Sequence, residues 1–283
     1  MKKITVAELR PFVRYARKLS ADMKKFSYPI CGYDNRLFYC TRGKGRIIAD
    51  GNAFDIKQGV LVYIRAGVPY YYLPDEEEPM RLLAFNFDFT FSASSVTAPI
   101  PPERAERFKA EDVVCCEEPE IMSDIGSVAV LSNMGYLYEK LSEIKDEFTS
   151  AKMLSEQRCS GLMLYILTEL ILACDSDQGG RGTDTVDTVI AYLRRHYAED
   201  ISNSDLGERF GYHPNYLNQL FIRYTGKSLY KYLQDLRILK AIDRLQETDM
   251  AVSEVAVSVG FKDLPHFSRY FKQKTGHSPS DFR

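Results

Sequence analysis

The chain has 283 residues, of which 45% are hydrophobic and 12% aromatic, and its formal net charge is −2. This length and apolar content are sufficient for two folded domains and exclude an intrinsically disordered chain. The near-zero charge excludes a protein that is basic over its whole surface. Any affinity for nucleic acid must therefore come from the local placement of lysine and arginine.

The cysteines and the apolar stretches indicate a cytoplasmic protein with no membrane segment. All six cysteines precede residue 175, and none forms a Cys-x-x-Cys pair, which argues against a zinc ribbon. We expect ordinary buried thiols, with redox chemistry at the adjacent Cys115 and Cys116 as the less favoured alternative. The first residues lack the apolar region of a signal peptide. The most apolar stretch, residues 161–173, is too short to cross a bilayer.

Residues 36–90 predict an antiparallel β-barrel or sandwich. Short stretches rich in β-branched and aromatic residues recur at roughly ten-residue spacing, and turns such as Asp50-Gly51 separate them. The segment 85–89 alternates phenylalanine with asparagine or aspartate, which predicts a strand with one buried and one polar face. The other expected strands are 37–40, 46–49, 54–56, 60–64 and 70–73.

Two helices and a linker are expected after the strands. Apolar residues recur every three or four positions from Met134 to Phe148, and again around residues 162–171. In the second helix they cover a wider arc than one contact within the domain requires. We expect this helix to pair with its copy in a second subunit, giving a homodimer; the alternative is that it packs under the barrel. The polar, glycine-rich segment 175–184 predicts a flexible linker between domains at 1–174 and 185–283.

The last hundred residues contain one pattern twice. Residues 204–228 and 253–278 share spaced Ser, Gly, Phe and Thr-Gly positions at an offset of 49 to 50 residues. Each copy predicts a short helix, a glycine turn at Gly211 or Gly260, and a second helix. Ser202-x-x-Asp205 resembles a capping box before the first copy. A long amphipathic helix without Pro or Gly is expected between the copies, as a stiff spacer.

A duplicated helix-turn-helix predicts a protein that contacts double-stranded DNA in two places. The second helix of such a motif lies in the major groove, where Asn and Gln pair with adenine and Arg with guanine or phosphate. A helical solenoid is disfavoured, because solenoids usually need three or more repeats. We expect the buried stripes to be Tyr216, Leu217, Leu220 and Phe221 in the first copy, and Leu264, Phe267, Tyr270 and Phe271 in the second. The expected DNA contacts are Asn215, Asn218, Gln219, Arg223, Lys227, His266, Arg269 and Lys272, and for His266 packing beside Phe267 is an equal alternative.

The repeat resembles the DNA-binding domain of the AraC/XylS family of bacterial transcription regulators. The residues that carry the resemblance are Asp205-Leu206, Tyr216-Leu217, Phe221, Thr225-Gly226, Tyr232-Leu233, Arg237, Ala241, Glu254-Val255-Ala256, Val259-Gly260-Phe261, Phe267 to Lys272, Gly276, Ser278-Pro279 and Phe282-Arg283. The resemblance implies that the two recognition helices enter successive segments of the major groove. Two departures are Gly207, where the family usually has Ala, and Ala251, which replaces the cap Ser202 of the first copy.

Residues 30–90 resemble, more loosely, the cupin-like barrel that many members of this family carry. Here all four histidines lie in the C-terminal domain, so we expect no metal, no cofactor and no catalytic residues. We expect a small-molecule pocket instead, with Tyr39, Tyr70 and Tyr72 as aromatic walls. By resemblance to sugar-binding relatives, Arg42 and Tyr72 are its candidate ligand contacts. The alternatives are that Arg42 is a solvated turn residue and that the tyrosines are core residues.

The expected fold is therefore an α+β protein of two domains. A cupin-like antiparallel β-barrel with helices precedes an all-α domain of two helix-turn-helix motifs joined by a long helix. The expected function is sequence-specific transcription regulation in response to a small molecule such as a carbohydrate, with RNA polymerase as a partner if the protein is an activator. Two alternatives stay open, namely control by a protein partner and a cupin-type enzyme fused to a DNA-binding module.

Overall fold

The computed structural model describes residues 2–19, 28–91, 98–115, 117–150, 152–177 and 181–282. The chain divides into two compact units, residues 1–179 and 180–283. The expected linker at 175–184 spans this division. Helix occupies residues 175–177 and 181–184, however, and residues 178–180 lie outside the described part, as does Cys116. The linker boundaries therefore stay a prediction.

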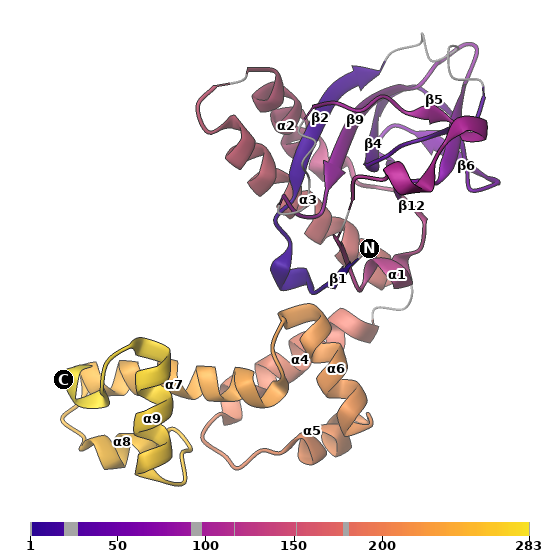
Figure 1. Ribbon diagram of the computed structural model, residues 1–283. Helices are drawn as coiled ribbons and strands as arrows, with labels where there is room; N and C mark the ends of the chain where they lie inside the picture. Colours follow the sequence, from indigo (N-terminus) through magenta and orange to yellow (C-terminus); the bar gives the residue numbers. More distant parts are fainter. Residues whose placement is uncertain are drawn as a thin grey trace. The chain divides into compact units, whose positions relative to one another are not determined.

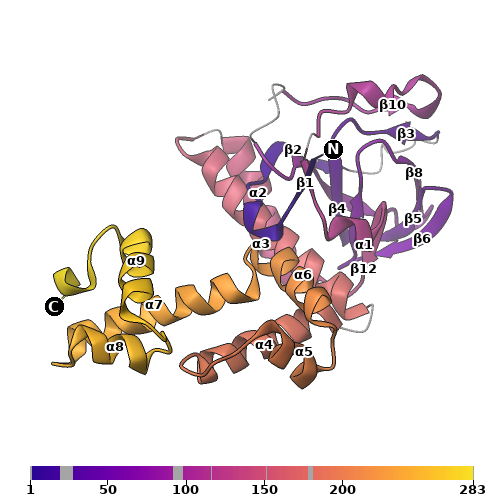
Figure 2. The ribbon, with the colours of Figure 1, turned by 60° about the horizontal axis from the view of Figure 1, so that its bottom comes forward.

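The N-terminal unit is built from two antiparallel five-stranded sheets that enclose a barrel-like interior (Figures 1 and 2). All six strands expected from the sequence are present. One sheet has the order β10 (Glu103–Arg104), β3 (Ile30–Cys31), β8 (Pro69–Pro74), β5 (Lys44–Ala49) and β6 (Asn52–Lys57). The other has the order β12 (Val128–Leu131), β7 (Leu61–Ile64), β4 (Asn35–Arg42), β9 (Arg81–Asp88) and β2 (Phe12–Leu19). A separate parallel pair joins β1 (Lys2–Ile4) to β11 (Glu117–Pro119).

The turn between β5 and β6 follows from its sequence. Asp50 and Gly51 both have positive φ angles, 50° and 75°, and Ala49 pairs with Asn52 across the turn. A two-residue hairpin needs this backbone conformation, which Asp and Gly adopt more readily than most residues. The Asp50-Gly51 dipeptide therefore fixes the register of the hairpin.

The strands β4 and β9 are buried on both faces. Phe38 and Ala84 face the interior between the two sheets, together with residues of β5, β6, β7 and β8. The other face of the sheet that contains β4 and β9 is covered by α2 (Tyr138–Ser150) and α3 (Ser155–Asp177), which lie beside β2 and β9 (Figure 1). The predicted alternation of an apolar and a polar face at residues 85–89 is present in β9, but the polar face is buried as well. Asn86 and Asp88 are only 5% and 3% exposed, because they point into the covered interior.

Helix α3 is longer than its apolar stretch suggested. Residues Ser155–Asp175 are long and apolar enough to cross a membrane by length and composition alone. The helix nevertheless contacts α2, β2, β12 and the short α1 (Met122–Ile125), and its buried side chains pack within the domain. Most of the wide apolar arc is therefore used inside the domain. Tyr165 and Leu172 remain exposed, and pairing of this helix between subunits stays a prediction.

The C-terminal unit is helical, with two small cores that share one long helix. Its helices are α4 (Arg181–His196), α5 (Asn203–Phe210), α6 (Pro214–Thr225), α7 (Leu229–Glu247), α8 (Val252–Ser258) and α9 (Leu264–Thr275). Leu229 and Leu233 at the start of α7 pack with α4, α5 and α6. Ile238, Ala241 and Leu245, later in α7, pack with α8 and α9. The expected spacer helix thus contributes to the core of both motifs.

The helix ends follow local sequence rules. The Ser202 Oγ accepts a hydrogen bond from the Asp205 amide at 3.2 Å, and the Asp205 carboxylate accepts one from the Ser202 amide at 2.8 Å. This capping box confirms the expectation from the sequence. In the second copy, Ala251 supplies no side-chain cap, but the Glu254 carboxylate still accepts from the Ala251 amide at 2.8 Å. The second motif therefore retains half of the box.

Gly207 has a packing role that helix propensity does not indicate. A Cβ atom at this buried position would lie 2.7 Å from the Tyr212 carbonyl oxygen and 2.9 Å from Pro214 Cγ. The glycine therefore lets α5 approach the start of α6 closely. This close approach accounts for the departure from the alanine usual in the family.

Replacing Gly207 with alanine should destabilise the protein by about 1 kcal/mol, because an overlap costing roughly 1–3 kcal/mol outweighs a helix-propensity gain of about 1 kcal/mol. Gly161→Ala in α3 is the matched control, since a Cβ there meets no atom within 4 Å. It should stabilise the protein by about 0.5–1 kcal/mol. Urea unfolding followed by circular dichroism measures both changes, and equal stabilisation by the two substitutions would contradict the packing role.

Candidate DNA interface and ligand cavity

The first motif presents α6 as its second helix. Leu217, Leu220 and Phe221 are buried as expected, whereas Tyr216 is 55% exposed and stacks on Tyr212 with ring centres 5.7 Å apart. The placement of Tyr216 in the buried stripe is therefore wrong. Asn215 and Gln219 are exposed, as the sequence predicts for base-contacting side chains.

Of three other predicted DNA contacts of the first motif, Asn218 and Arg223 are half-buried and Lys227 is exposed but ion-paired. The Asn218 Oδ1 accepts a hydrogen bond from the Leu229 amide at 3.1 Å, which ties α6 to the start of α7. The Lys227 Nζ lies 2.8 Å from the Asp235 carboxylate, so its charge is already paired. The positions of side chains around a single helix do not predict such contacts with a neighbouring helix.

The second motif presents α9, which keeps two cationic side chains exposed. Phe267 and Phe271 are fully buried, but Leu264 is 40% exposed and Tyr270 only half-buried, which corrects the predicted stripe. Arg269 and Lys272 are exposed and make no ion pair with any residue in the described ranges. His266 is half-buried. Its ring packs edge-on against Phe261, with centroids 5.5 Å apart, and not against Phe267 as the packing alternative stated, so the DNA contact of His266 stays a prediction.

One carboxylate, that of Asp235 in α7, contacts both motifs. It lies 2.8 Å from Lys227 Nζ at the end of the first motif. It also lies 2.6 Å from Lys274 Nζ and accepts a hydrogen bond from the Tyr270 hydroxyl at 3.0 Å, both in α9. Burial alone would raise the pKa of Asp235, but the hydrogen bonds from these three partners outweigh burial and lower it. The carboxylate therefore stays ionised and holds the two motifs together.

A second connection between the motifs runs through the loop after α4. The buried Arg237 guanidinium donates to the carbonyl oxygens of Tyr197 and Glu199, each at 2.7 Å. Gly260 in the second motif, with a φ of 94°, approaches the same loop so closely that a Cβ would lie 2.8 Å from the Ala198 carbonyl oxygen. The two motifs and this loop therefore form one packed unit.

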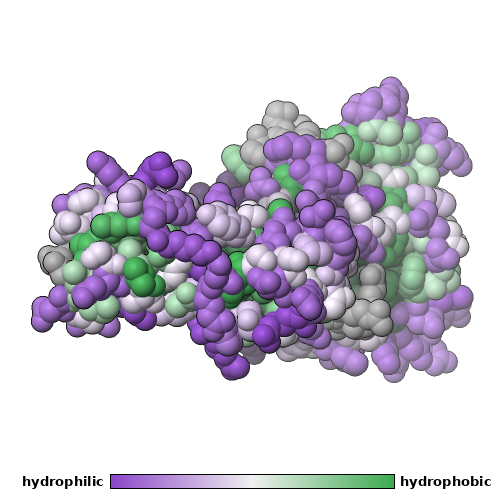
Figure 3. Space-filling model, turned by 90° about the horizontal axis from the view of Figure 1, so that it is seen from below, coloured by the Kyte–Doolittle hydropathy of each residue, from purple (hydrophilic) through white to green (hydrophobic). Residues whose placement is uncertain are grey.

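The surface seen in Figure 3 is mostly hydrophilic and is interrupted by small hydrophobic patches.

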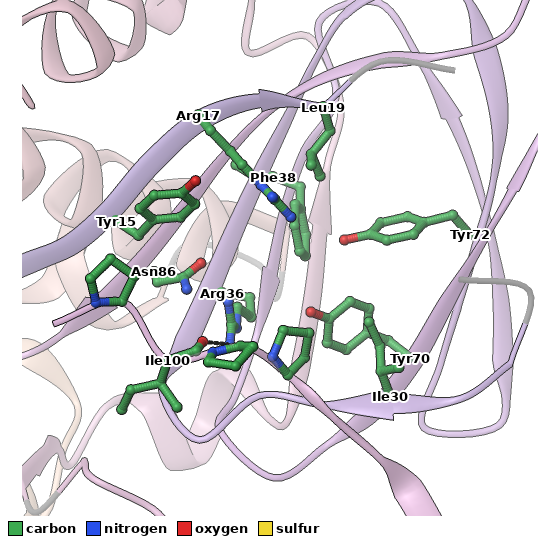
Figure 4. Close-up of a pocket in the computed structure, with 14 residues that line it drawn as sticks. Tyr15, Arg17, Leu19, Ile30, Arg36, Phe38, Tyr70, Tyr72, Asn86 and Ile100 are labelled. Carbon is green, nitrogen blue, oxygen red and sulfur yellow. Dashed lines mark hydrogen bonds between the residues drawn. The ribbon is translucent and has the colours of Figure 1, made fainter. Parts of the chain in front are cut away.

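The N-terminal unit contains a cavity of about 310 Å³ inside the barrel. Arg17 from β2, Arg36 and Phe38 from β4, and Tyr70 and Tyr72 from β8 reach into it, and both tyrosine hydroxyls point toward its centre (Figure 4). The remaining lining residues are Tyr15, Leu19, Ile30, Ala84, Asn86, Pro99, Ile100, Pro101 and Pro102. Burial raises the pKa of both hydroxyls, that of Tyr72 well above its ordinary value, so both remain protonated donors.

Of the predicted ligand contacts, Tyr70 and Tyr72 line this cavity, and Tyr39 and Arg42 do not. Alternate residues of a strand point to opposite faces. Tyr39 therefore points away from Phe38 and the interior, toward α2, where its ring stacks on Tyr138 at 6.1 Å. Arg42 is exposed at the end of β4 and lines a separate hollow. The same alternation places Arg36, which the sequence analysis missed, on the interior face with Phe38.

The Arg36 guanidinium is held at the cavity wall by specific contacts. Its Nη2 lies 2.8 Å from the Asp34 carboxylate and donates to the Ile100 carbonyl oxygen at 3.4 Å. Gly32 provides the necessary space, because a Cβ at that position would overlap Arg36 Nε. Only 5% of Arg36 is exposed, but its side chain forms part of the cavity wall.

Behind the cavity lies a buried network of charges that sequence reasoning also missed. Arg14 Nη1 donates to Asp34 at 3.0 Å, and the same guanidinium pairs with Asp88. The Cys115 thiol donates to Asp88 at 2.8 Å. A register shift between β2 and β9 places Arg14 in a β-bulge, which re-aims its side chain into the interior. Residues 14, 34, 88 and 115 are distant in sequence, so only the fold brings them together.

Comparisons with known proteins agree with this two-part architecture. A helix-turn-helix domain family matches residues 206–283, and a cupin domain family matches residues 33–86. The transcriptional activator RhaS of Pectobacterium carotovorum is 31% identical over 123 residues, which cover 43% of this chain and 44% of that protein. The regulator YobQ of Bacillus subtilis is 36% identical over 94 residues, which cover 33% of this chain and 39% of that protein. The chain thus spans less than half the length of either of these two relatives.

A solved structure is also similar to the helical unit. The C-terminal domain of AraT from Geobacillus stearothermophilus is 28% identical, and the match covers 36% of this chain and 86% of that one with a TM-score of 0.35. The family matches and the curated relatives lead to one conclusion. The helical unit contains a helix-turn-helix domain similar to that of the transcriptional activator RhaS, and the N-terminal unit contains a cupin domain, which supports the resemblance to the AraC/XylS family.

Proposed function

We propose that the protein is a sequence-specific DNA-binding transcription regulator whose N-terminal domain senses a small molecule. The observation that carries the proposal is the exposed, unpaired Arg269 and Lys272 on the second helix of a helix-turn-helix. Asn215 and Gln219 are exposed on the equivalent helix of the first motif. Side chains of these types on a recognition helix read base edges and bind phosphates.

The same proposal covers the partners and the location. Double-stranded DNA is the primary partner, and a homodimer in the cytoplasm would bring four motifs to the DNA. RNA polymerase is a further partner if the protein activates transcription; the relative RhaS is named a transcriptional activator.

We propose no catalytic activity. One relative, AdaA of Bacillus subtilis, is named both an activator and a DNA repair enzyme, and it is 29% identical over 36% of this chain. A stoichiometric bound metal in the purified protein would instead support a cupin-type enzyme.

Arg269→Ala should weaken binding to the specific operator by about 1–3 kcal/mol and relax sequence preference at one position. The reason is that an arginine that pairs with guanine contributes discrimination as well as affinity. Operators are first identified by genome-wide binding in the native cell, and affinities are then measured by fluorescence anisotropy. Equal weakening on specific and random DNA would make Arg269 a phosphate contact and remove it from the base-reading residues.

Lys272→Ala is the comparison for a phosphate contact. It should weaken binding to all sequences alike and reduce the slope of log affinity against log salt by about one. Lys140→Ala, in α2 of the N-terminal domain, should leave both the affinity and the slope unchanged. A normal salt slope for Lys272→Ala would contradict its assignment.

The small-molecule part of the proposal rests on the barrel cavity. Tyr70, Tyr72 and Asn86 provide polar groups among apolar walls, which is the usual composition of a ligand site. A ligand changes DNA binding only if it binds two arrangements of the protein with different affinity. Operator affinity should therefore shift when an effector is added. The alternative regulator, controlled by a protein partner, would show no such shift with any ligand that binds the cavity.

A further inference from the structure

We infer that the effector is a small carboxylate whose anionic group binds Arg17 and Arg36 and whose apolar part packs against Phe38 and Ile30. This inference rests on the proposed function, because it names the ligand class for the cavity of that sensor domain. It departs from the carbohydrate expected from the resemblance to sugar-binding relatives. Three features of the cavity support it, namely its charge, its hydrogen-bonding groups and its apolar wall.

The first feature is a positive charge that nothing in the described residues balances. Two guanidinium groups line the cavity, and no carboxylate is among its described lining residues. Asp34 and Asp88 balance Arg36 and Arg14 in the buried network. Arg17 stands over the Tyr15 ring, 5.5 Å from its centre, and makes no ion pair within the described ranges. An anion in the cavity would supply the missing negative charge.

The second feature is an excess of hydrogen-bond donors over acceptors. The two arginines donate only, whereas the inward-pointing Tyr70 and Tyr72 hydroxyls, which hydrogen-bond to each other, can both donate and accept (Figure 4). Asn86 contributes an amide with both kinds of group. A sugar brings one donor with every hydroxyl and would leave many of them without a side-chain acceptor. A carboxylate only accepts, and it matches the planar fork of arginine.

The third feature is the apolar remainder of the wall. Leu19, Ile30, Phe38 and Ala84 line the cavity opposite or beside the polar groups, and prolines 99, 101 and 102 close one side. The volume of about 310 Å³ lies at the lower end of the range for small-molecule sites. A compact acid with an aromatic or aliphatic body fits this combination better than a fully hydroxylated molecule does.

The test uses the full-length protein and pairs of probes that differ mainly in charge. Benzoate is compared with benzamide, and galacturonate with galactose, by isothermal titration calorimetry up to millimolar concentration. We expect an acid to bind and its neutral partner to bind at least about tenfold more weakly, because the neutral partner lacks the charge-assisted hydrogen bonds to arginine. Binding by benzoate rather than galacturonate would further show that the apolar wall contacts the body of the ligand.

Substitutions then locate the binding site. Arg17→Gln should weaken acid binding by about tenfold to a hundredfold. This arginine is exposed and has no ion pair in the described structure, so the variant should fold normally. Lys18→Gln, at the next exposed position of β2, is the matched control and should leave the affinity unchanged. Arg36→Gln should also weaken binding, with its folding checked by circular dichroism because Asp34 loses a partner.

Several outcomes would overturn the inference. These are equal binding of the neutral probes, unchanged acid affinity in Arg17→Gln, and absence of binding by every acid at millimolar concentration. DNA binding by the unliganded protein is measured separately on the operators from genome-wide mapping. A protein that binds these operators but no acid contradicts only the ligand class. A protein that binds an acid but no DNA contradicts the proposed function.

Discussion

Replacing Arg14 with methionine should lower the free energy of unfolding of the N-terminal domain by about 3–5 kcal/mol, because it leaves the buried Asp88 without its cation and leaves Asp34 with Arg36 alone. The side chains of Arg14 and Asp34 are completely buried, and that of Asp88 is nearly so. Methionine fills much of the same volume, so the loss reports charge rather than a cavity. Hydrogen exchange of amides in β4 and β9 measures the unfolding of this domain.

The pH dependence of this loss provides a second measurement. Burial raises the pKa of Asp34, although Arg36 and Arg14 act in the opposite direction. Without Arg14, this pKa should rise further above its value in the unfolded chain. An acid with a raised pKa in the folded state binds more protons folded than unfolded, so the fold gains stability as the pH falls. The penalty of Arg14→Met should therefore be complete at neutral pH and smaller as Asp34 becomes protonated.

A matched substitution on the same strand separates charge burial from general damage to β2. Lys18 is exposed and makes no ion pair in the described structure, so Lys18→Met should change stability by less than about 0.5 kcal/mol. A loss for Arg14→Met that is equally small, or that stays constant as the pH falls, would show that the network does not carry the expected energy.

Gly260→Ala should destabilise the second helix-turn-helix by about 2–5 kcal/mol. Part of the loss, roughly 1–2 kcal/mol, comes from a φ of 94° in a residue with a Cβ. A further loss of about 1–3 kcal/mol comes from overlap of that Cβ with the Ala198 carbonyl, which belongs to the loop after α4. Faster hydrogen exchange in peptides that cover α8 and α9 would measure the effect in the motif that carries Arg269.

The repeat itself supplies the control, since Gly211 is the equivalent turn residue of the first motif. It has a φ of 73°, but a Cβ there would meet no atom within 4 Å. Gly211→Ala should therefore cost only the backbone strain, about 1 kcal/mol. Equal losses for the two substitutions would mean that the contact with Ala198 contributes nothing and that the turn alone determines the requirement for glycine.

The sequence predicted those features that depend on neighbouring residues. The six strands, the Asp50-Gly51 hairpin and the Ser202–Asp205 capping box all arise from local patterns, and each is present. The duplicated helix-turn-helix was visible because each copy repeats the same local rules. The fold class followed from these features, whereas the family was indicated by a resemblance that specific residues carry.

What the sequence did not predict depends on contacts between distant residues. Alternation predicted a polar face that carries Asn86 and Asp88, but it does not show whether that face is covered, and both residues are buried. Alternation also does not show which face of β4 borders the cavity. The sequence analysis placed Tyr39 there, but Arg36, on the opposite face of the strand, lines the cavity. Lys227 was expected to be available for DNA. Its ammonium group instead pairs with Asp235, eight residues later in the helix α7.

The Asp235 contacts set the register in which DNA can be read. Under the proposed function, α6 and α9 occupy successive stretches of the groove while one carboxylate holds Lys227, Tyr270 and Lys274 together. One inserted base pair between those stretches would rotate the second by roughly 35° about the duplex axis. Following that rotation would separate α9 from α7 and break these contacts. We therefore expect the domain to accept one spacing between its two recognition sequences, determined by the contacts of Asp235 with Lys227, Tyr270 and Lys274.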